Sequence, residues 1–328
     1  MSAAQAADNY SVLKPAGVQA ATILTLWHIT LGVCSIVFAG VLAALLFAVH
    51  RSRRGVRDNH AAEGKAAAMQ ARPATRRWVA GASIASALAL TGLVVIDFMT
   101  DRALSRLPVA DALHIEMTGS QWWWEARYPG RDGQPGFAVS NDLHIPVGRP
   151  VVVTLQAADV IHTFWVPNLH GKKDMLPGRP TTIEFRADEA GTYRGQCAEF
   201  CGVQHAFMAF GVTAETPEQF DQWQAHQAAP AANPSDDTAT RGRDVFLASS
   251  CAGCHTVRGT SATGNLGPDL THFASRPTIA AGTVPNERSV LMQWVRDPQS
   301  LKTGTTMPPA ALPESDLQAV VHYLASLK

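Results

Sequence analysis

The sequence predicts a multidomain chain with a helical hairpin that crosses a membrane, an all-β domain and a small all-α domain. Two long apolar runs near the N-terminus predict the hairpin. After Asp111, apolar and polar residues alternate with a period of two, which is typical of strands. Beyond Thr238, apolar residues recur at helical spacing around a Cys-x-x-Cys-His motif. The expected parts are residues 1–110, 111–225 and 239–328, with residues 226–238 as a linker.

Composition excludes some classes of function. The 328 residues include 27 Lys and Arg and 27 Asp and Glu, so the formal charge is zero and no global field indicates binding to nucleic acid. Four of the five cysteines form two close pairs, Cys197/Cys201 and Cys251/Cys254, a spacing typical of metal and cofactor sites. The fifth, Cys34, lies in an apolar run, where we expect a small buried hydrophobe.

The two apolar runs cover residues 21–49 and 78–97, and each is long enough to cross a bilayer. A pair of buried helices in a soluble protein is the alternative. The first 20 residues have no basic segment leading directly into an apolar core, so we expect no cleavable signal peptide. Arg76 and Arg77 precede the second run, which begins at Trp78 with no acidic residue at its start.

A basic stretch, residues 51–77, separates the two runs. Short basic loops stay in the cytoplasm, so both termini should lie on the outer face. Its basic residues are Arg51, Arg53, Arg54, Arg57, Lys65, Arg72, Arg76 and Arg77.

The middle of the chain alternates apolar and polar residues at 113–118, 153–156 and 182–186, with Gly and Pro between these segments. This pattern predicts a small antiparallel β-sandwich or barrel that ends near Phe220. In such a fold, a loop between late strands and a histidine from an earlier strand can meet at one end.

Residues 197–208 read Cys-Ala-Glu-Phe-Cys-Gly-Val-Gln-His-Ala-Phe-Met. Two thiols, one imidazole and one thioether on a short loop form a ligand set that suits copper. A disulfide between Cys197 and Cys201, or a zinc site with two Cys and two His ligands, are the alternatives.

The pattern C-x-E-x-C-x-x-x-H-x-x-M resembles the binuclear copper A loop of cytochrome c oxidase subunit II. Residues 159–167 resemble the family segment that supplies a second histidine, here His162. The resemblance implies a cupredoxin fold and two copper ions bridged by both thiolates. The implied ligands are His162, Cys197, Glu199 through its backbone carbonyl, Cys201, His205 and Met208.

Two further segments resemble the same family. Residues 121–124, Gln-Trp-Trp-Trp, are similar to its aromatic segment, which implies that an exposed Trp122 ring covers the copper and receives electrons. Residues 174–179 are similar to a loop that implies contact of Asp174 and Arg179 with the catalytic subunit. The Glu199 carboxylate would face a magnesium ion at that boundary. Ordinary aromatic packing and an ordinary surface turn are the alternatives.

Cys251-Ala252-Gly253-Cys254-His255 is the signature of c-type haem attachment. Cys251 and Cys254 would form the thioethers, and His255 would bind the iron. Residues 266–270 resemble the Gly-Pro-x-Leu turn of class I cytochromes c, whose proline packs near that histidine. Met307 stands where a sixth ligand is expected.

Three helices should surround this motif, at residues 241–250 with Phe246 in the core, at residues 289–295, and from Glu314 or Ser315 to the C-terminus. Packing in the cytochrome family would set Gly242 and Tyr323 near a helix crossing.

Taken over the whole chain, the resemblance implies the electron-input subunit of a caa-type haem-copper oxidase in a bacterial cytoplasmic membrane. A cytochrome c or an upstream cytochrome complex would reduce the covalent haem c. Electrons would pass through copper A to haem in subunit I, where oxygen is reduced and protons are pumped. Subunit III and membrane lipid are further expected partners, and both soluble domains would lie on the periplasmic face. An input subunit of a nitric oxide reductase and a membrane-anchored copper-storage module are the alternatives.

Overall fold

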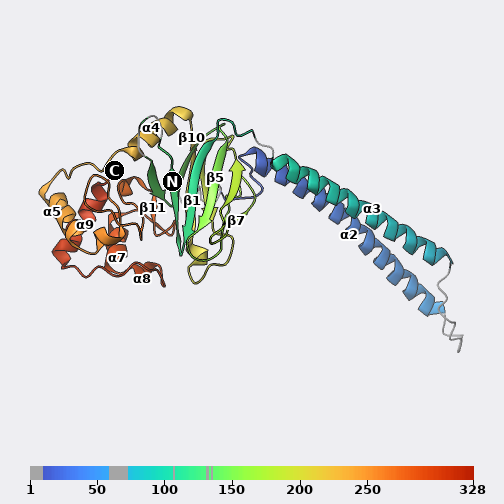
Figure 1. Cartoon of the computed structure of the whole chain (residues 1–328). Helices are drawn as coiled ribbons and strands as arrows, with labels where there is room; N and C mark the ends of the chain where they lie inside the picture. The colour runs from blue at the N-terminus through green and yellow to red at the C-terminus, as the bar shows by residue number, and fades with distance from the viewer. Residues whose placement is uncertain (1–9, 59–72, 106–107, 131–132, 134–135) are drawn as a thin grey trace. The chain divides into compact units, whose positions relative to one another are not determined.

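The computed structural model describes residues 10–58, 73–105, 108–130, 133 and 136–328. These residues form two compact units. Thr22–Arg106 is one unit, and Met1–Ala21 together with Leu107–Lys328 is the other. The first contains the two long helices in Figure 1, and the second contains every described strand.

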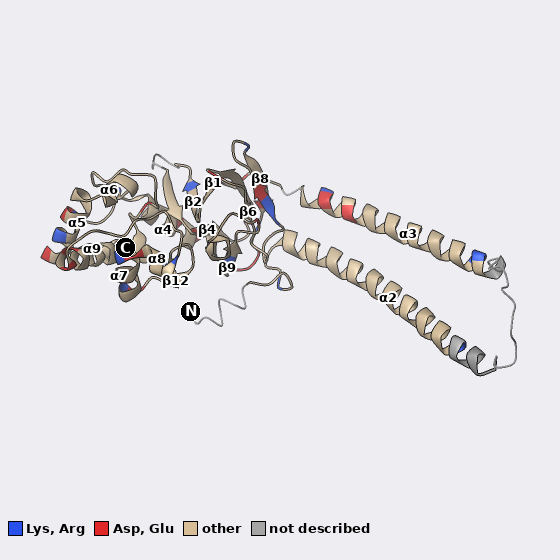
Figure 2. Ribbon diagram, turned by 90° about the horizontal axis from the view of Figure 1, so that it is seen from below, with Lys and Arg blue, Asp and Glu red and all other residues tan. Residues whose placement is uncertain are grey.

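Two long helices, α2 (Val18–Asp58) and α3 (Pro73–Leu104), run in opposite directions (Figure 1). Within them, Val18–Arg51 and Thr75–Leu104 are long and apolar enough to span a membrane. Figure 2 shows Lys, Arg, Asp and Glu only towards the ends of these helices. No part of either apolar window is buried among the described residues, which contradicts the alternative of buried helices in a soluble protein.

Cys34 corrects one expectation. It was expected to be buried, but it is exposed, because none of the described residues covers that part of α2. The basic stretch between the helices includes residues 59–72, which lie outside the described residues, so its cytoplasmic location stays a prediction.

The β domain contains a five-stranded sheet in the order β3-β2-β1-β5-β8 and a three-stranded sheet in the order β4-β10-β9. A short pair, β6 and β7, stands apart from both sheets. The strands of the β domain are β1 (Leu113–Ser120), β2 (Trp123–Tyr128), β3 (Phe137–Ser140), β4 (Asp142–Pro146), β5 (Val151–Ala157), β6 (His162–Phe164), β7 (Lys173–Met175), β8 (Thr181–Phe185), β9 (Gly191–Gln196) and β10 (Ala209–Glu215).

The alternation found in the sequence is visible in β1, where Leu113, Ile115 and Met117 are buried and the residues between them are more exposed. The expected antiparallel arrangement is wrong for two strand pairs. β1 pairs with β5 in parallel, with Leu113 opposite Val151, and β4 pairs with β10 in parallel. In both cases the chain passes through other strands before it returns, so a tight hairpin does not set the direction.

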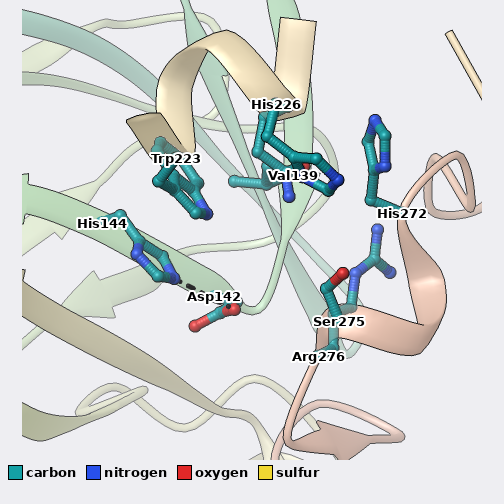
Figure 3. A pocket seen from close by; sticks show the side chains of 9 residues that line it. Val139, Asp142, His144, Trp223, His226, His272, Ser275 and Arg276 are labelled. Atoms are coloured by element: carbon teal, nitrogen blue, oxygen red, sulfur yellow. Dashed lines mark hydrogen bonds and ion pairs between the residues drawn. The ribbon is translucent and has the colours of Figure 1, made fainter. Parts of the chain in front are cut away.

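Helix α4 (Pro217–Ala228) packs against the β domain and begins with a capping box between Thr216 and Gln219. Its Trp223 ring stacks on His144 of β4, with centroids 4.3 Å apart. A cavity of about 240 Å³ lies where α4 and β4 meet the turn around Ser275 (Figure 3). Its lining includes His226, His272 and Arg276, but none of the predicted copper or haem ligands.

The C-terminal region is helical and has its own core, which includes Phe246, Leu291, Val320 and Leu324. The three predicted helices are present as α5, α7 and α9. Its elements are α5 (Asp237–Ala248), α6 (Cys251–Cys254), η2 (Phe273–Ser275), β11 (Thr278–Ile279), β12 (Val284–Pro285), α7 (Arg288–Arg296), α8 (Pro298–Leu301) and α9 (Glu314–Ser326).

Helices α5 and α9 cross at Gly242. A Cβ atom at this position would lie 2.0 Å from the carbonyl oxygen of Ala319 and 2.8 Å from Tyr323 Cβ. Only glycine lets the two backbones approach this closely. The expectation that Gly242 and Tyr323 lie at a helix crossing is therefore confirmed.

Candidate metal centre and haem attachment site

The thiols of Cys197 and Cys201 lie together at one end of the β domain. Cys197 follows β9, and Cys201 is on the loop that leads to η1 (His205–Phe207). Both are buried and free, and their sulfurs are 3.8 Å apart. A disulfide requires about 2.05 Å, so the structure shows two separate thiols. Two sulfurs at this separation can both contact the same pair of metal ions.

Each of the two predicted histidines lies beside a different thiol. His162 Nδ1 is 3.9 Å from Cys197 Sγ, and His205 Nδ1 is 3.6 Å from Cys201 Sγ. The Met208 sulfur is buried, and it lies 3.8 Å from Cys201 Sγ. Ligand atoms of His162, Cys197 and Cys201 lie within 4.8 Å of one another, which makes them a group able to hold a metal ion.

Glu199 presents two different groups. Its backbone carbonyl oxygen is 3.2 Å from Cys197 Sγ, so it lies at the edge of the thiol pair. The residue is exposed at the surface of the β domain. The carbonyl oxygen is thus close to the thiols, as the predicted role of copper ligand requires. The role of the Glu199 carboxylate at a magnesium ion stays a prediction.

Asp159 orients His162, a role that the motif alone did not assign. Asp159 Oδ1 lies 2.8 Å from His162 Nε2, and Asp159 Oδ2 accepts a hydrogen bond from the backbone N–H of Gln121. With the proton on Nε2, the lone pair of Nδ1 faces Cys197. The ring also rests on Gly119, where a Cβ atom would lie 3.1 Å from His162 Cδ2.

The close packing of the thiols separates their proton affinities. The hydrogen bond between the two thiols lowers the pKa of Cys197 and raises the pKa of Cys201. Burial also acts to lower the pKa of His162, but hydrogen bonds to Cys197 and Asp159 outweigh it and raise that pKa. A bound metal cation would favour the thiolate form of both cysteines.

Trp122 and Gln121 both bind the backbone of the ligand loop. Trp122 Nε1–H and Gln121 Nε2–H donate to the carbonyl oxygen of Cys201, at 3.0 and 2.7 Å. The Trp122 ring was expected to be exposed, but it is half-buried, because it packs against the β-domain core. Its role in receiving electrons stays a prediction.

Asp174 and Arg179, the predicted contacts with a catalytic subunit, are both exposed. Asp174 Oδ1 also accepts a hydrogen bond of 2.7 Å from Thr163, next to His162. This bond links β7 to β6, so Asp174 supports the strand that carries one predicted ligand.

The Cys-x-x-Cys-His motif forms helix α6 and the residue after it. Cys251 and Cys254 are free and half-buried. His255 Nδ1 lies 2.8 Å from the carbonyl oxygen of Pro268, so its N–H donates there and Nε2 is left for iron. Burial lowers the pKa of His255, which favours the neutral imidazole that can bind a metal.

Met307 is half-buried in the segment before α9. Its role as sixth ligand stays a prediction. The donor set in the β domain fits a binuclear copper site, and the free thiols with an oriented His255 fit a covalent haem.

Two family models match the chain. The model described as "Cytochrome C oxidase subunit II, periplasmic domain" matches residues 133–215, and the cytochrome c model matches residues 239–328. With the observed helices and sheets, these matches confirm the predicted fold class: an apolar hairpin, a cupredoxin-like domain and a helical cytochrome c domain.

Several relatives are similar over much of the chain. Cytochrome c oxidase subunit 2 of Alkalihalophilus pseudofirmus is 42% identical over 219 residues, which cover 66% of this chain and 62% of that protein. The chain thus spans less than two thirds of that relative's length. The alternative cytochrome c oxidase subunit 2 of Bradyrhizobium diazoefficiens is 32% identical over 231 residues, which cover 61% of this chain and 78% of that protein.

A solved structure is also similar to part of the chain. It is the periplasmic domain of subunit II of cytochrome oxidase from Bradyrhizobium japonicum, at 33% identity and a TM-score of 0.34. The match covers 37% of this chain and 96% of that domain.

Proposed function

The chain belongs to the cytochrome c oxidase subunit 2 family, and from this membership we propose that it is the subunit through which electrons enter a haem-copper terminal oxidase. The observation that carries the proposal is the convergence of two free thiols, two imidazoles and a thioether in one mostly buried cluster. The same chain carries a haem attachment motif. When bound, covalent haem c and binuclear copper A would supply one-electron redox chemistry between an external cytochrome and haem in subunit I.

The chain's own residues would hold and shield the copper pair. Cys197 and Cys201 would hold it through their thiolates, and His162 and His205 through their imidazoles. Asp159 fixes the His162 ring, so one ligand is oriented before metal binds. Because Cys197, Cys201 and Met208 are almost inaccessible to solvent, the protein excludes water and limits rearrangement around the site.

In the cytochrome c domain, Cys251 and Cys254 would tether the porphyrin by thioethers. The Pro268 carbonyl orients the ring of His255, whose Nε2 would bind the iron. Met307 would be the sixth ligand, and a thioether there would raise the reduction potential of the iron.

The apolar helices and three exposed residues of the β domain support a proposed location and proposed partners. The apolar helices α2 and α3 would anchor the chain in a bacterial cytoplasmic membrane, with residues 111–225 and 239–328 on the periplasmic side. Asp174 and Arg179 are exposed and available to contact subunit I. The exposed Glu199 carboxylate could reach a magnesium ion at that boundary. Subunit III is a further proposed partner.

Purification of the complex from its native membrane tests this function. We expect the chain to copurify with a catalytic subunit that consumes oxygen when reduced cytochrome c is supplied. A complex that instead reduces nitric oxide and leaves oxygen untouched would contradict the proposal and support the nitric oxide reductase alternative. A chain that purifies alone and releases its copper to a chelator would support metal storage.

A further inference from the structure

Lys302 is a residue of the cytochrome c domain that lies against the copper ligand loop, here defined as residues 197–209. It follows α8, and only 3% of its surface is exposed. Its ammonium Nζ donates to the carbonyl oxygens of Trp122 and Phe207, each at 2.9 Å, and of Ala280 at 3.0 Å. Two of these acceptors are in the β domain, and one is in the cytochrome c domain. One cation therefore joins the two domains.

A buried lysine is costly unless its charge is compensated. The ammonium group has three donors, and the three carbonyls provide one acceptor for each of them. Burial lowers the pKa of Lys302 to about 7, which agrees with extensive loss of water around the group. A side chain this buried has no role in binding an external acidic partner. Its three contacts indicate a structural link at this position.

Further contacts surround Lys302. The backbone N–H of Ala209 donates to the carbonyl of Ala281 at 3.1 Å, and the Gln204 side chain donates to the carbonyl of Thr303. At Gly304, a Cβ atom would lie 2.8 Å from Val203 Cγ2 and 4.0 Å from the Trp122 ring. The segments 280–283 and 302–304 therefore lie directly against the copper ligand loop and Trp122.

We propose that Lys302 is a positioning residue that holds the chain's own cytochrome c domain over Trp122 and the copper ligand loop. This inference rests on the proposed function. The surface over Trp122 is then occupied from within the chain, and a soluble donor reaches the haem domain first. One electron lost by haem iron would be gained by the copper pair, with no proton transferred and no other reactant needed.

Hydrogen exchange in the full-length chain in detergent tests the link without redox activity. We expect the Ala209 amide to exchange about tenfold faster in Lys302→Met, because the contact that protects this amide opens more often. The matched control is Lys328→Met, which changes an exposed lysine of the same domain and should leave that amide unchanged. Equal protection of Ala209 in wild type and Lys302→Met would overturn the proposal.

Rapid-mixing kinetics on the protein loaded with copper and haem tests the consequence. In Lys302→Met, the haem-to-copper rate should fall about tenfold while both absorption spectra and both potentials stay as in wild type. Reduced soluble cytochrome c should also begin to reduce copper directly, an effect that loss of stability alone would not produce. An unchanged haem-to-copper rate would overturn the positioning role.

Two results separate this inference from the proposed function. If the wild-type protein holds both cofactors but passes no electron between them, the proposed function fails, whatever the exchange data show. If wild type transfers rapidly and Lys302→Met does also, only the role of Lys302 fails. Should Lys302→Met lose its haem or copper spectrum, Gly304→Val replaces it. Its added side chain would press on Val203 and strain a backbone with a φ of 88°, while residue 302 remains lysine. The Ala209 amide should exchange faster in Gly304→Val as well. An unchanged exchange rate at Ala209 in that variant would count against the proposal.

Discussion

Cys197 and Cys201 determine what the metal centre can be, because their sulfurs lie 3.8 Å apart in a buried position. Replacing Cys201 with Ser would remove one of the two proposed bridging thiolates and leave the other proposed ligands in place. We expect Cys201→Ser to lose the binuclear copper spectrum and to keep the haem spectrum, as measured by optical absorption. Cys34→Ser, in the apolar helix α2, is the control and should change neither. Full retention of the copper spectrum in Cys201→Ser would refute the bridging assignment.

Replacing Met307 tests whether this residue is the sixth ligand of the haem iron. In Met307→Leu the iron would lose a thioether, so the reduction potential of the haem should fall and oxidase turnover should slow. A redox titration followed in the haem absorption band measures the potential. Met292→Leu is the matched control, since Met292 packs against the core of the same domain. The same potential in Met307→Leu and wild type would rule out Met307 as the axial ligand.

The ligand residues could be predicted from the sequence, because Cys, His and Met at this fixed spacing have few other uses together. The residues that support the ligands could not be predicted in this way. Asp159 matters through one contact with His162, and Lys302 matters through carbonyls that are up to 180 residues away. Backbone carbonyls belong to every residue, so no letter in the sequence marks those at Trp122 and Phe207 as acceptors.

At the scale of elements, the crossing of α5 and α9 depends on Gly242. Gly242→Ala would place a methyl group 2.0 Å from the Ala319 carbonyl oxygen, so the helices must separate. We expect a loss of about 1–3 kcal/mol in the free energy of unfolding, typical of overpacking. Thermal unfolding followed by haem absorbance measures it. Asp244→Ala, on the exposed side of α5, should unfold near the wild-type temperature, and an equally stable Gly242→Ala would contradict the close crossing.

Helix α4 is joined to β4 partly by His144. Burial acts to lower the pKa of His144, but hydrogen bonds and charges of Asp142 and Glu215 outweigh it and raise the pKa to about 9. The folded state therefore holds this proton more tightly than the unfolded state, whose histidine titrates near its ordinary pKa of about 6.5. This contribution to stability is fully present below about pH 6.5 and is lost as the pH rises through about 9.

Urea unfolding at about pH 6 and about pH 10 measures this loss, which should be on the order of 3 kcal/mol in wild type. His144→Phe keeps an aromatic ring against Trp223 but cannot bind a proton, so its pH dependence should be correspondingly smaller. The same pH dependence in both proteins would show that His144 is not the titrating group.

Elements were easier to predict than their pairing. The alternation at Leu113, Ile115 and Met117 predicts a strand with one buried face, and the structure shows it. The parallel pairing of β1 with β5 was missed, because alternation is the same in parallel and antiparallel strands. A helix was predicted at residues 241–250, before the Cys-x-x-Cys-His motif, and it is present as α5 with Phe246 buried as expected.

For the whole molecule, the sequence predicted the succession of hairpin, β domain and helical domain. It did not predict that segments 280–283 and 302–304 would lie against the copper ligand loop. That contact depends on the shapes of two complete domains and has no local pattern. The membrane orientation stays a prediction, because much of the basic stretch lies outside the described residues.

Metal analysis of the intact, purified chain tests the central claim most directly. If Cys197 and Cys201 bridge a copper pair in a chain that also carries one covalent haem, elemental analysis should find two coppers for each haem iron. Recovery of a single zinc, or of no metal besides haem iron, would contradict the claim and leave the chain as a membrane-anchored cytochrome.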